Sequence, residues 1–375
     1  MLLDRNDRVT QNRFLEHTRL RYTFIRQQLQ FPRDEAAYIQ LLRRLRINIV
    51  LDLTDMDTLP VFHATDAAGA SYINTALNDA SRPIHQVVPL IHPTRQRPHQ
   101  APHIISSGMN PGVVNIWVTH GVRHYGVPDE IVHFEYDTSM ALDGWRPMIT
   151  WSRREFLTET VWEPTGLVEA GHVRMLPTNA LQNRIDLRPV MEPVVKLSSY
   201  PKGFLVLHEE NVKLGTLLGA SSSYVYALHP KTMRYLVERW RERGTVLIGD
   251  LEIGDNTSVP LGGSDTIGVC LMYRPRRRVY YLNSLSNESV VGTNATCAQV
   301  AVGVYAALIT LLSTPLRPRV YFATDLYDTI YPQVLFSNLR VEHFLCTRRE
   351  KTWVVTSHVR ELHPRLAVHW EPSVI

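Results

Sequence analysis

Apolar positions in the first 125 residues alternate between the spacing of a helix and the runs of a buried strand. Four apolar side chains after Pro32 recur at i, i+3, i+4 and i+7: Tyr38, Leu41, Leu42 and Leu45. This spacing predicts a helix with one buried stripe. The β-branched run 47–53 then predicts an interior parallel strand. A helix near 60–68 and a strand near 69–75 repeat the rhythm, which predicts βαβ units and an open parallel sheet.

The pattern is interrupted and then resumes before residue 125. Residues 79–102 carry five prolines among polar residues, which predicts a long loop. Ile104 and Ile105 resume a strand, and residues 113–125 predict a helix with Pro111 at or before its first turn.

The middle of the chain has a different character. Three strand-like segments and one helix are expected there, at 131–136, 203–207, 223–228 and 231–243. An apolar helix at 297–312 and a strand at 319–323 suggest that the chain then returns to the first sheet. We therefore expect a first domain over 1–125, an α+β domain over 126–293 and a returning segment over 294–375.

Glycine is absent before Gly69. A Rossmann unit needs glycines after its first strand, because the pyrophosphate lies against bare backbone there, and an acid about 20 residues later holds the ribose. Asp4 suits that acidic position, so the chain is expected to begin inside the fold. The predicted fold class is α/β, with an N-terminally incomplete Rossmann-like parallel sheet and an inserted α+β substrate and dimerisation domain.

Composition narrows the function classes. The net charge of 40 − 36 = +4 is too mild to indicate nucleic-acid binding, and the basic run 274–278 reads as a solvated hairpin tip. Three separated cysteines without a CxxC pair favour a reducing cytoplasm and no disulfide framework. The apolar run 297–312 is shorter than a membrane span, so no membrane contact is expected. The sixteen scattered histidines predict no metal site.

Several stretches in order resemble homospermidine synthase, a member of the saccharopine dehydrogenase-like group. The similarity is clear from Gly108 to about Glu342. Its carriers are Ser107-Gly108-Met109-Asn110-Pro111-Gly112, Phe134-Glu135-Tyr136-Asp137-Thr138, Thr150-Trp151-Ser152 with Glu159, His208-Glu209-Glu210, Tyr224-Val225-Tyr226-Ala227-Leu228-His229-Pro230, Ser264-Asp265-Thr266-Ile267-Gly268-Val269 and Asn294-Ala295-Thr296-Cys297-Ala298-Gln299-Val300.

The resemblance implies a reaction and a cofactor. Enzymes of this family use tightly held NAD to oxidise putrescine to an imine, release ammonia and join the aminobutyl unit to a second amine. The hydride then returns to the new imine, so NAD is recycled. A homodimer is expected as well.

A diamine carries two ammonium groups, so its pocket should hold carboxylates at two depths beside an aromatic wall. The candidate acids are Glu135, Glu159, Glu210 and Asp265, one of which must accept a proton before hydride leaves the adjacent carbon. Trp151 is the expected cation–π partner. The remaining candidates are His208 as a proton relay and, on the cofactor side, Asp4, Asn110, Pro111 and Gly112.

Each candidate has an ordinary structural alternative. The acids are four among 36, and Trp151 is equally typical of a strand core. Pro111 and Gly112 suit a plain turn and helix start, and His208 suits pairing with neighbouring backbone. Asn294 fits a helix N-cap better than a catalytic role.

Two departures from the family pattern affect the substrate. The family usually has an acidic residue after its Tyr-Ile-Asp-Thr stretch, whereas this chain continues to Asn78 and Asp79, with Asp79 as the candidate substitute. Thr266 stands where the family has glutamate. The acceptor amine is therefore open. Two other functions also stay open: a related imine-reducing dehydrogenase of the carboxynorspermidine or saccharopine type, and a cofactor-free paralogue that only binds partners or ligands.

Overall fold

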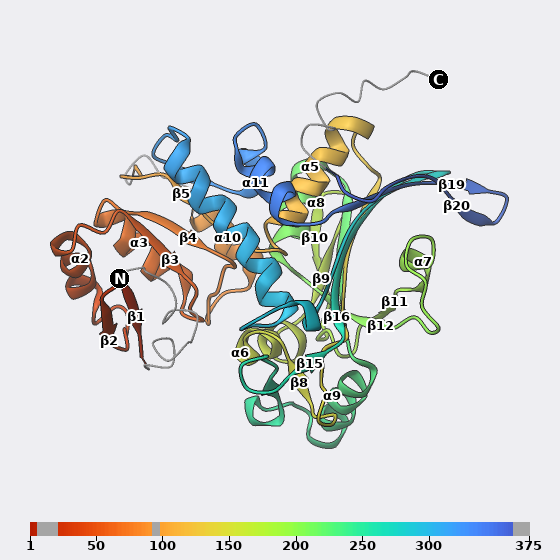
Figure 1. Ribbon diagram of the computed structural model, residues 1–375, viewed down its shortest axis with the longest axis horizontal. Coiled ribbons are helices and arrows are strands. Elements are labelled where there is room, and N and C mark those ends of the chain that lie inside the picture. The colour runs from red at the N-terminus through yellow and green to blue at the C-terminus, as the bar shows by residue number, and fades with distance from the viewer. Residues whose placement is uncertain (6–21, 92–97, 363–375) are drawn as a thin grey trace.

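The computed structural model describes residues 1–5, 22–91 and 98–362, and it contains two separate layers of sheet (Figure 1). The smaller sheet is parallel throughout. Its order is β18 (Val320–Tyr321), β5 (His103–Ile104), β4 (Ser71–Asn74) and β3 (Ile49–Asp52). Since β18 joins β5, the chain does return to this sheet after residue 294, as expected. The open parallel sheet expected from the βαβ rhythm is confirmed.

Helices α2 (Glu35–Arg44), α3 (Thr58–Ala67) and α4 (Ile84–Leu90) accompany the smaller sheet. Tyr38 and Leu42 of α2 pack with Phe62 of α3 and Tyr72 of β4 in one core. Leu45 lies beyond the end of α2 and is exposed, so the stripe is shorter than predicted.

Two other expectations for this region are wrong. The region 79–102 contains the helix α4, which begins directly after Pro83, because proline at a helix start leaves no N–H unpaired. Strand β3 lies at the edge of its sheet rather than in the interior, and Leu51 is 42% exposed there. A run of β-branched residues therefore predicts that a strand forms, but it does not predict whether that strand lies at the edge or in the interior of the sheet.

A short parallel pair, β1 (Leu2–Asp4) with β2 (Phe24–Arg26), forms a sheet of its own among the described residues. Asp4 ends β1 and pairs in register with Arg26. Asp4 therefore stands at the end of a strand, and its predicted contact with a ribose stays a prediction.

Among the residues that the structure describes, the larger sheet has ten strands and is mostly antiparallel. Its main path is β10 (His172–Met175), β9 (Gly166–Glu169), β13 (Ser221–Leu228), β6 (Glu130–Asp137), β16 (Ser264–Tyr273), β17 (Arg277–Ser286), β19 (Glu342–Arg349) and β20 (Thr352–Val359). Strand β12 (Lys202–Val206) pairs with β13, and β11 (Arg184–Asp186) pairs with β12. This confirms an α+β character for the middle of the chain.

The C-terminal expectation is wrong for the last two strands. β19 and β20 extend the larger sheet beside β17, so the segment 294–375 does not return to the smaller sheet as a whole. Residues 274–276 form the tip of the hairpin of β16 and β17, as predicted, whereas Arg277 and Arg278 lie in β17, where Arg278 contacts the ring of Trp353.

Helix α10 (Ala295–Ser313) runs diagonally between the two sheets in Figure 1 and contacts β4 of one and β16 and β17 of the other. Asn294 caps it by accepting a hydrogen bond from the N–H of Cys297 at 2.8 Å, the ordinary role expected for that residue. The length and hydropathy of α10 suffice for a membrane span, and 39% of its apolar window is buried inside the fold.

The remaining helices cover the larger sheet or join it to α10. They are α5 (Val113–Tyr125), α6 (Arg153–Leu157) with the π-helical turn Thr158–Trp162, α7 (Arg188–Met191), α8 (Glu209–Leu218), α9 (Pro230–Arg243) and α11 (Tyr331–Asn338). Short turns and two-residue strands complete the fold: Met140–Ala141, Met148–Ile149, Ile248–Asp250, Glu252–Ile253, Leu261–Gly262, Asn287–Ser289 and Ala323–Leu326. The predicted helices at 113–125 and 231–243 are both present.

Candidate active site

The loop that follows β5 is held tightly against α10. Gly112 has a φ of +128°, and a Cβ atom there would lie 2.3 Å from the carbonyl oxygen of Gly108. A Cβ on Gly303 of α10 would lie 2.2 Å from the same oxygen. Ser107 also donates a hydrogen bond to the carbonyl of Gly303 at 3.0 Å. These contacts fix the position of Asn110 at the centre of the loop.

Pro111 and Gly112 form the turn that leads into α5. The side chain of Asn115 accepts a hydrogen bond from the N–H of Gly112 at 2.8 Å, so the first turn of the helix is capped. The contacts thus show the ordinary structural role for both residues. Contact of either residue with a cofactor stays a prediction.

Asn110 connects this loop to the larger sheet. Its side-chain amide donates to Glu135 at 2.5 Å and to the phenol oxygen of Tyr224 at 2.7 Å. Tyr224 in turn donates to the same Glu135 oxygen, Oε2, at 2.5 Å. Glu135 is therefore held at the junction of the two sheets by two donors.

Three buried acids share one face of the larger sheet. Glu135 and Asp137 are two residues apart on β6, and Asp265 of β16 is the register partner of Asp137. Each is at most 2% exposed. Burial raises the pKa of Glu135 to about 7, and burial together with Glu135 and Asp137 raises the pKa of Asp265 well above its usual value. The three carboxyl groups are therefore not all ionised at neutral pH.

Two threonines connect Asp137 to Asp265. The hydroxyl oxygen of Thr150 lies 2.8 Å from Asp137, and that of Thr296 of α10 lies 2.8 Å from Asp265, both within hydrogen-bond distance. The two threonine oxygens also lie 2.8 Å from each other. Burial raises the pKa of Asp137 despite the hydrogen bonds that it accepts.

A second acidic group surrounds His208 at the start of α8. Its Nδ1 forms a short contact with Glu210 and lies 3.1 Å from Glu209, and its Nε2 lies 3.6 Å from Glu159. Burial opposes protonation of the imidazole, but these three carboxylates outweigh it and raise the pKa of His208 well above 6.5. His208 is therefore charged at neutral pH and pairs with carboxylates, rather than with backbone alone.

The acids around His208 differ in their proton affinity. Burial, and secondarily Glu209 and Glu155, raise the pKa of Glu159 to about 8 although His208 acts against this. Glu210 behaves in the opposite way, because His208 outweighs burial and lowers its pKa. One protonated and one ionised carboxyl group therefore flank the same imidazole near pH 7.

Aromatic rings form a row along these acids. The indole N–H of Trp151 donates to the hydroxyl of Tyr226 at 3.2 Å. Ring centroids along the row are separated by 6.4 Å from Trp151 to Tyr226, 6.3 Å from Tyr226 to Tyr224 and 5.1 Å from Tyr224 to His208. Tyr226 is the register partner of Glu135 on the neighbouring strand. The aromatic row therefore runs beside the buried acids.

A pocket opens at the His208 end of the row. It lies between residues 77–87, from the part of the chain that forms the smaller sheet, and residues 155–164 and 207–209, from the part that forms the larger sheet. It is lined by five acids, Asp79, Glu155, Glu159, Glu163 and Glu209, and by one arginine, Arg82. Arg82 pairs with Asp79 at 3.0 Å. Glu159 and Glu209 also pair with His208 outside the lining. Glu155 and Glu163 form no ion pair with the described residues, so the excess of carboxyl groups makes this pocket suited to a cation.

The pocket is closed on one side by a contact between the part of the chain that forms the smaller sheet and the part that forms the larger sheet. The backbone N–H of Leu77 donates to Glu209 at 2.7 Å.

Burial raises the pKa of Glu155 to about 7, so this acid and Glu159 titrate near neutral pH. Asp79, the expected substitute for a missing family acid, does line the pocket.

The structure brings seven of the ten predicted site residues into one connected network. Within it lie Asn110, Glu135, Trp151, Glu159, His208, Glu210 and Asp265. Pro111 and Gly112 border the network through the turn, and Asp4 lies in the separate pair β1–β2. Their catalytic and binding roles stay predictions.

Sequence reasoning missed several members of the network. Asp137 stands two residues after Glu135, which places both on one strand face and was a usable signal. Tyr224 and Tyr226 show the same two-residue spacing on β13. The link between Thr150 and Thr296 had no local signal, because the two residues are 146 positions apart.

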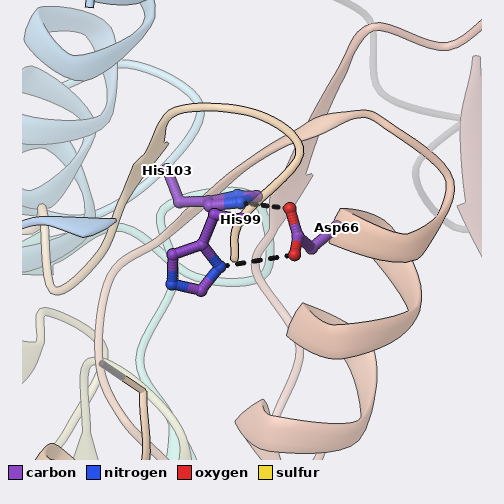
Figure 2. A group of neighbouring side chains, drawn as sticks. All are labelled: Asp66, His99 and His103. Atoms are coloured by element: carbon purple, nitrogen blue, oxygen red, sulfur yellow. Dashed lines mark hydrogen bonds and ion pairs between the residues drawn. The ribbon is translucent and has the colours of Figure 1, made fainter. Parts of the chain in front are cut away.

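A separate group of side chains of the types that can bind metals lies outside this network. Figure 2 shows His99 and His103, four residues apart, converging on Asp66 near the end of α3. His103 donates from Nε2 to Asp66 at 2.9 Å, and His99 approaches the second carboxylate oxygen at 3.3 Å. The Nδ1 of His103 accepts the backbone N–H of Tyr72 at 3.1 Å, so its Nε2 carries the proton. A protonated nitrogen does not bind a metal, so this group is a structural hydrogen-bond cluster.

Comparisons with known proteins define the class of fold. No protein-family description matches the sequence, and no curated protein is similar enough in sequence to be matched. Solved structures do match, and they show a Rossmann-like α/β fold.

Two of these structures are particularly informative. The homospermidine synthase of Legionella pneumophila, crystallised with NAD, is 17% identical with a TM-score of 0.69, over 86% of this chain and 80% of that chain. The saccharopine dehydrogenase (L-Glu forming) of Saccharomyces cerevisiae, in its apo form, is 10% identical with a TM-score of 0.58, over 91% and 93%. These likenesses establish the shared fold.

Proposed function

We propose that this protein is an NAD-dependent, homospermidine synthase-like enzyme that transfers an aminobutyl group from putrescine to a second amine. One observation carries the proposal: the aromatic row from Trp151 to His208 runs directly beside buried acids whose pKa values are raised. A buried carboxyl group whose pKa is raised gains most when a cation takes the place of its proton. This arrangement therefore selects positively charged amines.

The two acidic groups match the two ends of a diamine. Glu135, Asp137 and Asp265 lie at the inner end, and Glu159 and Glu209 lie at the pocket end near His208. The rings between them offer π faces along which the apolar methylene chain packs. We therefore propose a molecule with two ammonium groups and an apolar middle as the substrate class.

Glu135 is the best general base among these acids. Its pKa of about 7 lies near the operating pH, where proton acceptance from an ammonium is most effective. Asn110 and Tyr224 hold its carboxylate in one orientation. Trp151 holds the ammonium over its ring without a full ion pair, which allows the amine to lose its proton. His208, charged by its neighbouring acids, orients Glu159 and Glu210.

The residues at the ends of β4 and β5 fit the nicotinamide end of a dinucleotide. The hydroxyl of Ser106 is buried and has no hydrogen-bond partner among the described residues, and its φ is +53°. An unpaired hydroxyl in a strained conformation at the carboxyl end of a parallel strand marks the place where such ligands bind. Ser106 would hold the cofactor there, with Asp4 on the ribose side. When bound, NAD would take hydride from the amine carbon and return it to the imine.

The alternative dehydrogenases of the saccharopine or carboxynorspermidine type fit less well. Their substrates carry carboxylates, which need arginine or lysine in the pocket. Within the described ranges, Arg82 is the one basic residue that lines the pocket, and it already pairs with Asp79. The acid-rich lining therefore favours a diamine over an amino acid.

Product analysis tests this proposal. The protein is incubated with putrescine and NAD, and homospermidine is measured by mass spectrometry. We expect product that requires NAD and that disappears in Glu135→Gln. The matched control is Glu169→Gln on β9, an exposed acid paired with Arg174, which should leave product formation unchanged.

A calorimetric titration with putrescine alone separates the competing functions. Binding without product formation would favour the cofactor-free paralogue, and the enzyme proposal would then be wrong. Absence of both would overturn the amine site itself. The homodimer and the cytoplasmic location expected from the sequence belong to the same proposal, and light scattering tests the first.

A further inference from the structure

A second pocket lies away from the acidic network, between α9 and the segment that joins β11 to β12. Its volume is about 360 Å³. That is within the range of roughly 300–1,000 Å³ that is usual for sites of small organic ligands.

The charge of this pocket is opposite to that of the first. Four basic residues line it, Arg184, Lys202, Arg234 and Arg241, against the single acid Glu238. Within the described part of the chain, none of these four basic side chains forms an ion pair, a hydrogen bond or a contact with an aromatic ring. Surface arginines elsewhere, such as Arg239 and Arg243, do have acidic partners. The pocket therefore concentrates unneutralised positive charge.

The positive side chains come from two directions. Arg234 and Arg241 are seven residues apart on α9, so they lie two turns apart on one face of that helix. Arg184 lies on β11 and Lys202 on β12, across the pocket from the helix. An anion placed between them would be held from both sides.

The floor between these charges is apolar and aromatic. Leu228, Met233 and Val237 belong to the core under α9, and the rings of Tyr136 and Tyr200 complete the lining. Tyr200 is anchored by donating to the carbonyl of Val195 at 2.9 Å. The floor therefore offers a preformed surface for a flat or apolar body.

We propose that this pocket binds a small amphipathic anion, consisting of an aromatic or apolar body with a phosphate or carboxylate group. The apolar body would lie on Tyr136, Tyr200 and Met233, and the anionic group would reach the arginines of α9 and Lys202. The site is separate from the acid-lined pocket near His208, because the two pockets share no lining residue.

Titration with 1-naphthyl phosphate tests the proposal, with 1-naphthoate as the carboxylate probe and 1-naphthalenemethanol as the neutral one. We expect both anions to bind in the micromolar to millimolar range, to weaken as salt is added, and to bind in the presence of saturating putrescine. The neutral probe should bind at least tenfold more weakly, because it lacks the charge that the arginines recognise.

The variant Arg234→Ala/Arg241→Ala should weaken binding of the phosphate at least tenfold. The matched control is Arg239→Ala, which lies on the same helix, stacks on Tyr235 and pairs with Glu242. It should leave the affinity unchanged, and circular dichroism should confirm that both variants fold. Equal affinity in the double variant, equal binding of the neutral probe, or no binding of either anion would each overturn the proposal. Since the assay contains neither NAD nor turnover, it does not depend on the proposed enzyme activity.

Discussion

The hydroxyl oxygens of Thr150 and Thr296 lie 2.8 Å apart, and each also contacts a buried carboxylate at 2.8 Å, Asp137 for Thr150 and Asp265 for Thr296. Three consecutive hydrogen bonds require three protons, and two hydroxyl groups supply only two. The third proton must come from one of the carboxyl groups. This count agrees with the raised pKa values of both acids, which have burial as their main cause.

Thr296→Val should destabilise the protein by about 1–3 kcal/mol, because it leaves a buried carboxyl group without its donor. Thr296→Ser retains the hydroxyl and should cost less than about 1 kcal/mol. Urea unfolding at pH 7 measures both. Thr310→Val is a matched control on α10, since its hydroxyl bonds only to the carbonyl of Ala306 in the same helix. Equal losses for Val and Ser at position 296 would contradict the hydrogen-bonded row.

Tyr224→Phe removes one of the two donors that hold Glu135. Burial is the main reason that the pKa of Glu135 is raised to about 7, and the Tyr224 hydrogen bond acts against it, so the variant should have a still higher value. Less Glu135 is then ionised at pH 7. Putrescine turnover at pH 7 should fall about fivefold, equivalent to about 1 kcal/mol, and recover at higher pH.

The measurement for this variant is the pH profile of turnover. Tyr273→Phe is a matched control, because its hydroxyl donates to the carbonyl of Gly126 far from Glu135. A profile that drops uniformly at every pH would show that Tyr224 acts on structure rather than on the protonation of Glu135.

Trp151→Ala should weaken putrescine binding by about 2- to 30-fold, corresponding to a cation–π contribution of about 0.5–2 kcal/mol. Trp151→Phe keeps an aromatic face and should retain part of the affinity. Calorimetric titration measures the difference, with Trp353→Ala on β20 as the control, since that ring faces Arg278. If Ala and Phe at position 151 bind putrescine as the natural residue does, Trp151 belongs to the core alone.

The local parts of the fold followed from the sequence. The helices predicted at 113–125, with Pro111 before the first turn, and at 231–243 are present at Val113–Tyr125 and Pro230–Arg243. Predictions failed where a tertiary partner decides the outcome. A run such as that in β3 has the same composition at an edge as in the interior, and β19 joins β17 through pairing between distant segments.

The candidate site divides along the same line. Glu135, Glu159, His208 and Asp265 were found through a family resemblance, and residues at two-residue spacing beside them were accessible from strand geometry. The proton-sharing row could not be predicted, because it needs β6, β16 and α10 in contact. Raised pKa values depend on burial, which a sequence pattern indicates only for apolar residues.

Stability should fall as the pH rises from about 6.5 to 9. Below that range His120, His133 and His343 act in the opposite direction, because burial lowers their pKa values to about 3–4. Glu135 and Glu159 have folded pKa values of about 7 and about 8, mainly because they are buried, so between about 4.5 and 8 these two acids bind more protons in the folded state than in the unfolded state. The pKa of His208 is also raised, through its neighbouring carboxylates, and its contribution is present below pH 6.5 and lost as the pH rises through the folded value. Both effects have the same sign.

Thermal unfolding at a series of pH values measures this dependence. Glu159→Gln should flatten the decline, because the uncharged amide has no proton to lose, whereas Glu169→Gln should leave the slope unchanged. Putrescine should raise the midpoint more at pH 8 than at pH 5, since the ligand replaces protons on the same acids. A midpoint that is constant or rises over this range would show that the acids are ionised in the folded protein.

Gly112→Ala tests whether the loop after β5 positions the site. A Cβ atom at this residue would lie 2.3 Å from the carbonyl oxygen of Gly108, and the φ of +128° is unfavourable for alanine. Gly244→Ala is the matched control, because Gly244 ends α9 with a φ of +70° and open space around its Cβ position. The control should cost about 1–2 kcal/mol from backbone conformation alone. Gly112→Ala should cost more in urea unfolding and should also weaken putrescine binding, because Asn110 moves with the loop and releases Glu135. Equal costs for the two variants, with putrescine binding retained in both, would show that the loop tolerates displacement and that Asn110 does not position Glu135.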